Sequence, residues 1–322
     1  MLFHSHHNSP PPPSLLFTQH WLSRTQDTYV HNGEVCALSR DRPHELATMY
    51  YDEVTHNGQV ALTEHGHRIK GGLKCPKEIS TEKGLEHWKN YFPETKFIVT
   101  TRHPVSWFQS FYNYHAYGQY PKPVPHPNEL IGACYDGSEY LCTDHCGTER
   151  PGNSKICTNR ANFHHSLSRL GKTPMDTPEE MRLLNHGMSV VPHKGKIFLM
   201  EISQLFPDHE SSKHLREDMS EFLDLKYDLK PLHARHGTGT QNHEYTDDER
   251  KKAFVDICDD EYAPVREVLV EQGKDAAEWI RNYFLKSEDV VVSSRKEFLK
   301  LLDKWGEDPC VEKKEKKDEK KN

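Results

Sequence analysis

The sequence predicts an α/β fold, in which a parallel sheet is flanked by helices and followed by a helix-rich C-terminal part. Residues 96–101 (KFIVTT) and 196–203 (KIFLMEIS) contain unbroken apolar runs of strand length. Continuous apolar runs are typical of strands buried on both faces. Segments with helical spacing precede and follow each run, and strands that alternate with helices indicate a parallel sheet.

Helices are predicted where apolar residues recur at helical spacing behind a capping residue or a proline. Residues 177–187, for example, combine a capping box of Thr177 and Glu180 with a proline at the first helical position. The predicted helices are residues 14–26, 43–54, 80–92, 104–117, 159–171, 177–187, 212–225, 246–257, 261–285 with a break near Gly273, and 294–305. Residues 69–76 (IKGGLKCP) are predicted to be extended.

One domain is expected, at residues 14–309. It is flanked by a His- and Pro-rich start at 1–13 and a charged tail at 310–322, both of which are expected to be disordered because they are too polar to form a core. Within the domain, residues 118–158 are rich in Pro, Gly and Cys. A loop of this length in a compact domain is usually functional or an ordered insertion, so we expect it to face the substrate.

Charge and hydropathy narrow the classes of partner. The 322 residues carry a formal net charge of −7, so no overall basic field indicates nucleic-acid binding. No apolar run is long enough to span a bilayer. An anionic ligand therefore requires a local cationic site.

Four of the eight cysteines are clustered at Cys134, Cys142, Cys146 and Cys157. Their spacing lacks the paired C-x2-C knuckles of common structural zinc sites. We therefore favour disulfides that staple the insertion and expect no metal, although free thiols remain open for a cytosolic protein. A zinc-stabilised interaction protein, built on these cysteines and the nearby histidines as far as His165, is retained as an alternative.

The most informative stretch is KFIVTTRHPVSWFQSFYNY, residues 96–114, where a buried strand runs into a helix. Arg102 follows the strand directly, Pro104 starts the helix, and Ser110 lies two turns further on. A guanidinium can bind two phosphate oxygens at once, and the free N–H groups of a helix N-terminus favour an anion. The alternative is that Arg102 pairs with a carboxylate and that Ser110 is an ordinary helix residue.

This stretch resembles the 3′-phosphate-binding element of sulfotransferases that use 3′-phosphoadenosine 5′-phosphosulfate (PAPS). In that family a strand ends in Arg-x-Pro and a serine stands eight residues beyond the arginine, followed by an aromatic residue. Three further segments match in family order. The family's Lys-Thr-Pro strand is similar to GLKCP here, and its late strand and helix resemble KIFLMEISQL and SEFLDL. Its Arg-x-Gly loop resembles LHARHGTGTQ. The resemblance covers roughly residues 14–245.

The resemblance implies a P-loop NTPase-like architecture and transfer of a sulfonate group from PAPS to a hydroxyl or amine of an acceptor. Carbohydrate is the first candidate acceptor, with protein or a small alcohol as alternatives. The implied nucleotide-binding residues are Arg102, Ser110, Arg235 and Gly237. No metal is implied.

The resemblance also suggests two catalytic residues. Lys74, in GLKCP, would approach the bridging oxygen and the sulfonate. VHNGEVCALSR resembles the region that carries Gly-Glu-Glu in tyrosylprotein sulfotransferases, which makes Glu34 the first candidate for the base, with Val35 at the place of the second glutamate. Other candidates for the base are Asp52, Glu53 and His65.

One family element is absent from the written sequence. The family opens with a strand and a Pro-Lys-x-Gly-Thr-Thr turn that cradles the 5′-phosphate, whereas HNSPPPP stands at that place here, and proline removes N–H donors. Either the gene model is truncated or mis-joined, or the protein is an inactive relative that binds the nucleotide without turnover. We expect the full-length transcript to encode a Gly-rich loop upstream of Ser14. A Golgi location then follows, and a cytoplasmic one otherwise.

Overall fold

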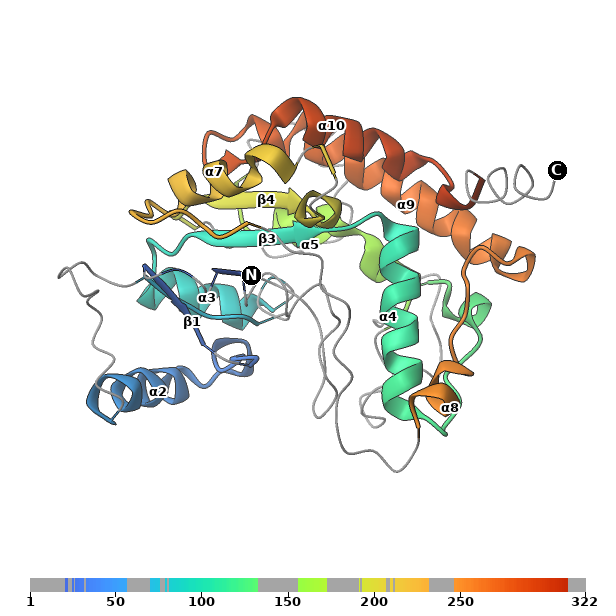
Figure 1. Cartoon of the computed structure of the whole chain (residues 1–322), viewed down its shortest axis with the longest axis horizontal. Helices are drawn as coiled ribbons and strands as arrows, with labels where there is room; N and C mark the ends of the chain where they lie inside the picture. Colours follow the sequence, from blue (N-terminus) through green and yellow to red (C-terminus); the bar gives the residue numbers. More distant parts are fainter. Residues whose placement is uncertain are drawn as a thin grey trace.

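The computed structural model describes residues 21–22, 25, 27–31, 33–56, 70–75, 79, 81–132, 156–172, 191, 193–206, 209–210, 212–231 and 246–311. For residues 53–56 and 213 it describes only the backbone. In this part the protein is an α/β fold with parallel sheets flanked by helices, which confirms the predicted class (Figure 1). Strands β1 (Thr28–Val30) and β2 (Lys70–Gly72) form a parallel pair. Strands β3 (Phe97–Thr101), β4 (Ile197–Glu201) and β5 (Val290–Val291) form a second parallel sheet in that order.

The described helices follow the predicted order. They are α2 (Pro43–His56), α3 (Glu82–Tyr91), α4 (Pro104–Gln119), α5 (Phe163–Ser168), α7 (Ser212–Phe222), α8 (Asp247–Lys251), α9 (Ala263–Asn282) and α10 (Arg295–Asp303). The predicted helices at 14–26 and 177–187 lie mostly or wholly outside the described residues. Helix α8 has the predicted capping box of Thr246 and Glu249 but ends at Lys251, six residues earlier than predicted.

The larger sheet is buried on both faces, as the apolar runs predicted. Phe97 and Val99 of β3 pack in the same core cluster as Trp279 of α9, whereas Ile98 packs with Met219 of α7 on the opposite face. Strand β4 alternates in the same way and is fully buried. The sheet is therefore the middle layer, and only its ends and edges are left to bind ligands.

The predicted break at Gly273 is wrong, because α9 is continuous there. A Cβ atom at this position would lie only 2.3 Å from the carbonyl oxygen of Trp305 and 3.2 Å from Cγ of Pro104. The glycine thus allows close packing of three segments instead of interrupting the helix. The folded part also includes Cys310, one residue beyond the predicted domain end, since Cys310 is buried and disulfide-bonded to Cys258.

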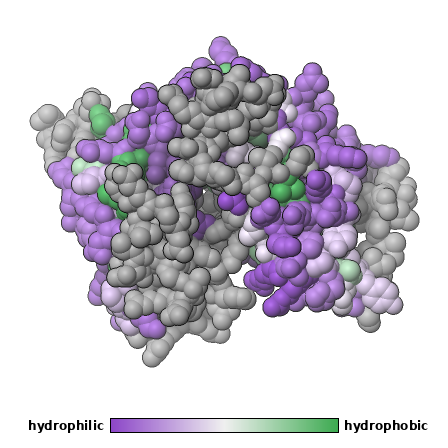
Figure 2. Space-filling model, turned by 180° about the vertical axis from the view of Figure 1, so that it is seen from behind, coloured by the Kyte–Doolittle hydropathy of each residue, from purple (hydrophilic) through white to green (hydrophobic). Residues whose placement is uncertain are grey.

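The face seen in Figure 2 is mainly hydrophilic in the described residues, with small and scattered hydrophobic patches. Among the helices of the described residues, none has the length and apolarity needed to cross a membrane.

Candidate functional site at the carboxyl ends of the strands

Arg102 lies between the end of β3 and the start of α4, as predicted. His103 is the N-cap of α4, and its Nδ1 accepts the N–H of Val105 at 3.2 Å. Pro104 occupies the first helical position, where its fixed φ suits the helix and its missing N–H costs nothing. The N–H of Trp107 donates to the carbonyl oxygen of His103 at 2.8 Å, so among the first-turn N–H groups that of Ser106 is left, at the positive end of the helix dipole.

The guanidinium of Arg102 makes no ion pair or hydrogen bond with any residue of the described part of the chain. The side chain is half-buried, and burial lowers its pKa, while the nearby carboxylate of Glu201 opposes that shift. The group nevertheless stays cationic, because arginine does not lose its proton in proteins. A half-buried cation without a close partner is suited to bind an anion.

Glu201 is a site residue that the sequence did not single out. It ends β4 in register with Thr101, so its carboxylate lies at the same sheet edge as Arg102. It is only 4% exposed, and it accepts the N–H of His103 at 3.3 Å and the N–H of Ser203 at 2.6 Å, together with the Ser203 hydroxyl. Burial raises its pKa, and the hydrogen bonds and the charge of Arg102 oppose that rise.

A signal for Glu201 was present in the sequence. A charged residue directly at the carboxyl end of an unbroken apolar run is the same pattern that identified Arg102. Neighbouring parallel strands end at one edge of a sheet. Applying the same pattern to both strands would therefore have predicted that Glu201 lies close to Arg102.

Ser110 lies two turns into α4 and is half-buried. In the described part of the chain, its hydroxyl has no hydrogen-bond partner. Within the described residues, Ser110 and Arg102 are thus both donors without a hydrogen-bond partner on the same strand-to-helix unit.

The two predicted catalytic residues, Lys74 and Glu34, lie side by side. Nζ of Lys74 is 3.6 Å from Oε1 of Glu34. The segments that follow β1 and β2 bring them together, because the N–H of Val35 donates to the carbonyl oxygen of Lys74 at 2.9 Å and Cys36 is disulfide-bonded to Cys75. The sequence named both residues but not this contact.

The environment of Lys74 is unusual for a lysine. Its side chain is fully buried, and within the described residues its ammonium makes no hydrogen bond of normal length, so the carboxylate of Glu34 is its ion-pair partner. Burial lowers the pKa of Lys74, and the nearby carboxylate of Glu34 opposes that shift. Glu34 is about one-fifth exposed, so the pair connects the interior to the surface.

The remaining predicted residues do not join this arrangement. Asp52 is exposed on α2, and the side chain of Glu53 lies outside the described part, as do His65, Arg235 and Gly237. Three of the clustered cysteines, Cys134, Cys142 and Cys146, lie outside the described part as well. Cys157 is disulfide-bonded, and within the described residues no group of three or more His, Cys, Asp or Glu could hold a metal.

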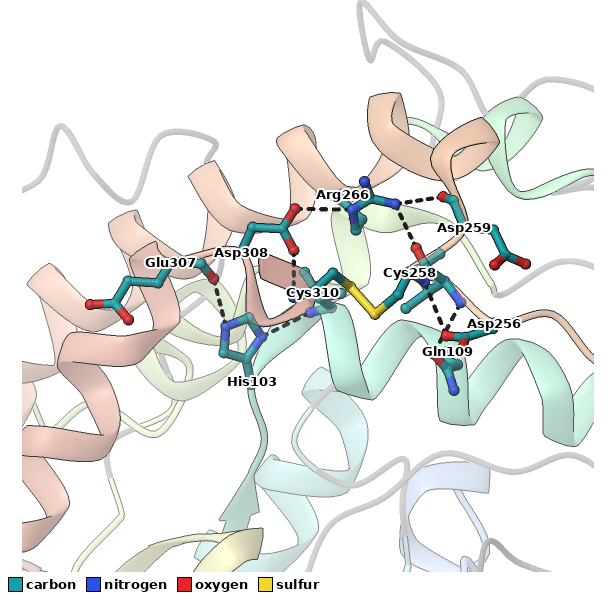
Figure 3. The surroundings of a disulfide bond; sticks show 11 residues. His103, Gln109, Asp256, Cys258, Asp259, Arg266, Glu307, Asp308 and Cys310 are labelled. Carbon is teal, nitrogen blue, oxygen red and sulfur yellow. Dashed lines mark hydrogen bonds and ion pairs between the residues drawn. A yellow bond between two sulfur atoms is a disulfide. The ribbon is translucent and has the colours of Figure 1, made fainter. Parts of the chain in front are cut away.

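A C-terminal segment braces the start of α4 (Figure 3). Nε2 of His103 lies 3.0 Å from the carbonyl oxygen of Lys304 and 3.1 Å from that of Glu307. The same segment is held by the ion pair between Asp308 and Arg266, at 3.0 Å, and by the Cys258–Cys310 disulfide. Because Nδ1 accepts a hydrogen bond from Val105, we assign the proton to Nε2 and infer that it donates to these carbonyls.

No protein-family model, curated protein or solved structure matches this chain.

Proposed function

We propose that this protein is a sulfotransferase that moves a sulfonate group from PAPS to a hydroxyl or amine of an acceptor, with carbohydrate as the first candidate. One observation supports this more than any other. Arg102 lies unpaired, within the described residues, at the carboxyl end of a buried parallel strand and at the N-terminus of a long helix.

This placement suits a phosphate for two physical reasons. Ligands of open α/β sheets bind beyond the carboxyl ends of the strands. A guanidinium binds phosphate oxygens in pairs, and the helix N-terminus adds the positive end of its dipole and the N–H of Ser106. In this proposal Arg102 and Ser110 hold the 3′-phosphate, while Arg235 and Gly237 are assigned on the resemblance to the sulfotransferase loop alone.

The pair of Lys74 and Glu34 suits the transfer step. As the acceptor oxygen attacks sulfur, its proton passes to the Glu34 carboxylate. The bond between sulfur and the phosphate oxygen breaks, and adenosine 3′,5′-bisphosphate leaves. The ammonium of Lys74, which lies beside the Glu34 carboxylate, donates to that leaving oxygen.

The test is calorimetry with adenosine 3′,5′-bisphosphate. We expect Arg102→Ala to weaken binding on the order of 10- to 100-fold, since a charge-assisted hydrogen bond contributes about 1.5–3 kcal/mol. Arg42→Ala is the matched control, because Arg42 is an exposed arginine just before α2 whose ion pair is with Glu45 in the first turn of that helix. Unchanged binding by Arg102→Ala would refute the phosphate site.

A second candidate is a nucleotide-binding protein without turnover. It is favoured by one observation: HNSPPPP, residues 7–13, stands where the resembled family carries its Pro-Lys-x-Gly-Thr-Thr turn, and its prolines have no N–H donors for a phosphate. A sulfonate-transfer assay run beside the calorimetry separates the two candidates. Binding of the bisphosphate without transfer to any acceptor supports the second candidate, and measurable transfer supports the first.

A further inference from the structure

A second arginine, Arg250 of α8, resembles Arg102 in lacking a carboxylate partner. It is only 6% exposed, and within the described residues its guanidinium makes no hydrogen bond or ion pair. Nε is buried, whereas the two Nη atoms remain accessible to solvent. A largely buried cation without a partner is costly for the fold. Arg250 is therefore suited to bind an anion through its Nη atoms.

Acidic residues precede Arg250 in α8, but their carboxylates are engaged elsewhere. Glu249 accepts both the N–H and the hydroxyl of Thr246 at 2.8 Å, in the capping box of the helix. Asp248 is exposed and lies 3.6 Å from Nζ of Lys251. These contacts hold the two carboxylates at the start of the helix and on its exposed side, so they leave the charge of Arg250 without a counter-ion.

Tyr117 of α4 brings three different groups together. Cζ of Arg250 lies 4.7 Å from the centroid of the Tyr117 ring, and this cation–π contact orients the guanidinium. The hydroxyl of Tyr117 donates to Oδ1 of Asp247 at 2.6 Å. The ring of Phe254, which is 41% exposed, lies 6.2 Å from that of Tyr117. A cation, a carboxylate and an exposed aromatic ring thus surround one tyrosine.

These groups define the chemistry of a ligand. Residues 247–252 comprise three acidic and three basic side chains, so they provide no net charge to attract a polyanion such as a nucleic acid. A single guanidinium instead suits a single carboxylate. The ring of Phe254 suits an apolar face, and Oδ2 of Asp247, which has no partner among the described residues, can accept a hydroxyl.

A sugar ring that carries a carboxylate satisfies all three requirements. Its weakly positive C–H groups suit the negative face of an aromatic ring, and its hydroxyls donate hydrogen bonds. A fatty acid lacks the hydroxyls, and a neutral sugar lacks the charge.

The groups around Tyr117 are remote from Arg102. A helical rise of about 1.5 Å per residue places Tyr117 about 20 Å from Pro104 along α4. Figure 1 shows α8 beside the end of α4 that lies away from the sheet. A single sugar unit cannot span this separation, so a glycan that reaches both places must be an oligomer.

We propose that Arg250, Tyr117 and Phe254 form a binding site for a carboxylate-bearing sugar unit of a glycan. The carboxylate pairs with the Nη atoms of Arg250, the sugar ring packs on Phe254, and Asp247 accepts a hydroxyl. As a subsite for the acceptor, this site rests on the proposed sulfotransferase function and specifies an acidic oligosaccharide as the acceptor. The binding itself does not depend on that function.

The test is calorimetry of the full chain with a hyaluronan tetrasaccharide, in which glucuronate alternates with N-acetylglucosamine. The matched control ligand is the same tetrasaccharide with its carboxylates reduced to primary alcohols. We expect saturable binding of the first ligand and at least about tenfold weaker binding of the second, because the charge-assisted hydrogen bonds are lost. Hexanoate, a carboxylate without a sugar ring or hydroxyls, should not displace the tetrasaccharide at an equal concentration.

Two variants locate the site. We expect Arg250→Gln to weaken binding of the tetrasaccharide at least about tenfold, and Phe254→Ala to weaken it roughly threefold or more. Arg42→Ala, which removes an exposed arginine outside this site, should bind unchanged. Urea unfolding of each variant verifies that it is folded. If Arg250→Gln does not fold, Phe254→Ala decides, because its exposed ring contributes little to the core.

The proposal is overturned by no saturable binding of the tetrasaccharide, by equal binding of its reduced form, or by displacement with hexanoate. Unchanged affinity in a folded Arg250→Gln or in Phe254→Ala would overturn it as well. Binding of adenosine 3′,5′-bisphosphate, measured on the same samples, separates this proposal from the proposed function. Loss of that binding refutes the nucleotide site alone, whereas loss of tetrasaccharide binding beside intact nucleotide binding refutes the glycan site alone.

Discussion

At the scale of single residues, Arg102 and Glu201 bring opposite charges to one sheet edge without forming an ion pair. Glu201 instead accepts hydrogen bonds from His103 and Ser203, which occupy both of its oxygens. The guanidinium is therefore attracted to the carboxylate yet free to bind a ligand. A phosphate at Arg102 would be repelled by the same carboxylate.

Replacing Glu201 tests that repulsion. We expect Glu201→Gln to strengthen binding of adenosine 3′,5′-bisphosphate at pH 7 by roughly three- to tenfold, because one buried like charge is removed while the amide oxygen still accepts from Ser203. Calorimetry at constant ionic strength measures the change. Glu217→Gln on the exposed side of α7 is the control and should have no effect. Weaker binding in Glu201→Gln would mean that the carboxylate positions Arg102 and that its repulsion of the ligand is negligible.

His103 links the stability of this corner to pH. Burial lowers the pKa of His103 from 6.5, the charge of Arg102 acts in the same direction, and the carbonyls of Glu307 and Lys304 with the charge of Asp308 oppose it. The folded protein therefore takes up this proton at lower pH than the unfolded chain. The stabilisation is fully present above about pH 6.5 and is lost as the pH falls through the folded-state pKa.

The check is the free energy of unfolding in urea between pH 8 and 5. His103→Asn keeps a good N-cap but does not titrate. We expect the free energy of unfolding of His103→Asn to fall less steeply below pH 6.5 than that of the wild type. The slopes should differ by up to about 1.4 kcal/mol per pH unit, which corresponds to one proton. His193, whose pKa burial also lowers, is present in both proteins and cancels in the comparison. Identical slopes would show that His103 is protonated equally in the folded and unfolded states.

The residues of the site differ in how far the sequence could predict them. Arg102 was recognisable because its neighbours along the chain define its position at a strand end. The contact between Lys74 and Glu34 was not, because it depends on the pairing of β1 with β2 and on a disulfide between Cys36 and Cys75. Contacts that arise from pairing of distant segments leave no local pattern.

At the scale of elements, long segments were predictable from their own sequence, whereas most short ones depend on pairing with distant segments. Strands β3 and β4 and helix α4 were predicted because each spans enough residues to show an apolar run or a period. Strand β1 has three residues and β5 has two, and both were missed, whereas the equally short β2 lies in the stretch 69–76 that was predicted to be extended. Strands this short depend mainly on their neighbours for their conformation, so the local signal is weak.

Helix α9 offers a prediction about packing between elements. In an exposed helix Gly→Ala stabilises by roughly 0.5–1 kcal/mol. For Gly273→Ala we expect the opposite, a loss of about 1–3 kcal/mol, because the new methyl group would overlap the carbonyl of Trp305 and press on Pro104. Chemical denaturation measures the change. Gly306→Ala, whose nearest neighbour is a side-chain atom of Lys274 at 3.6 Å, should change stability by less than about 0.5 kcal/mol. A stabilised Gly273→Ala would contradict the close packing of α9 on α4.

At the scale of the whole molecule, each of two disulfides stabilises one part of the proposed site: the Lys74–Glu34 pair or the region around Arg102. Cys36–Cys75 closes a separation of 39 residues beside Lys74 and Glu34. Cys258–Cys310 closes 52 residues and holds the segment that contacts His103, next to Arg102. In the chain-entropy treatment both contribute about 4 kcal/mol, because the dependence on loop length is logarithmic.

The two disulfides should stabilise the fold to a similar extent, but they lie beside different residues of the proposed site. Removing each one should therefore affect function differently. We expect Cys36→Ala with Cys75→Ala, and Cys258→Ala with Cys310→Ala, to lower the free energy of unfolding by similar amounts of about 2–5 kcal/mol. The first double variant should lose sulfonate transfer while keeping its affinity for adenosine 3′,5′-bisphosphate, because it releases Lys74 from Glu34. The second should lose affinity, because the start of α4 is no longer braced behind Arg102. Denaturation, calorimetry and the transfer assay measure the three quantities on the same samples. If both variants lose affinity in parallel, the disulfides serve global stability only, and the division of the site into a binding half and a catalytic half is wrong.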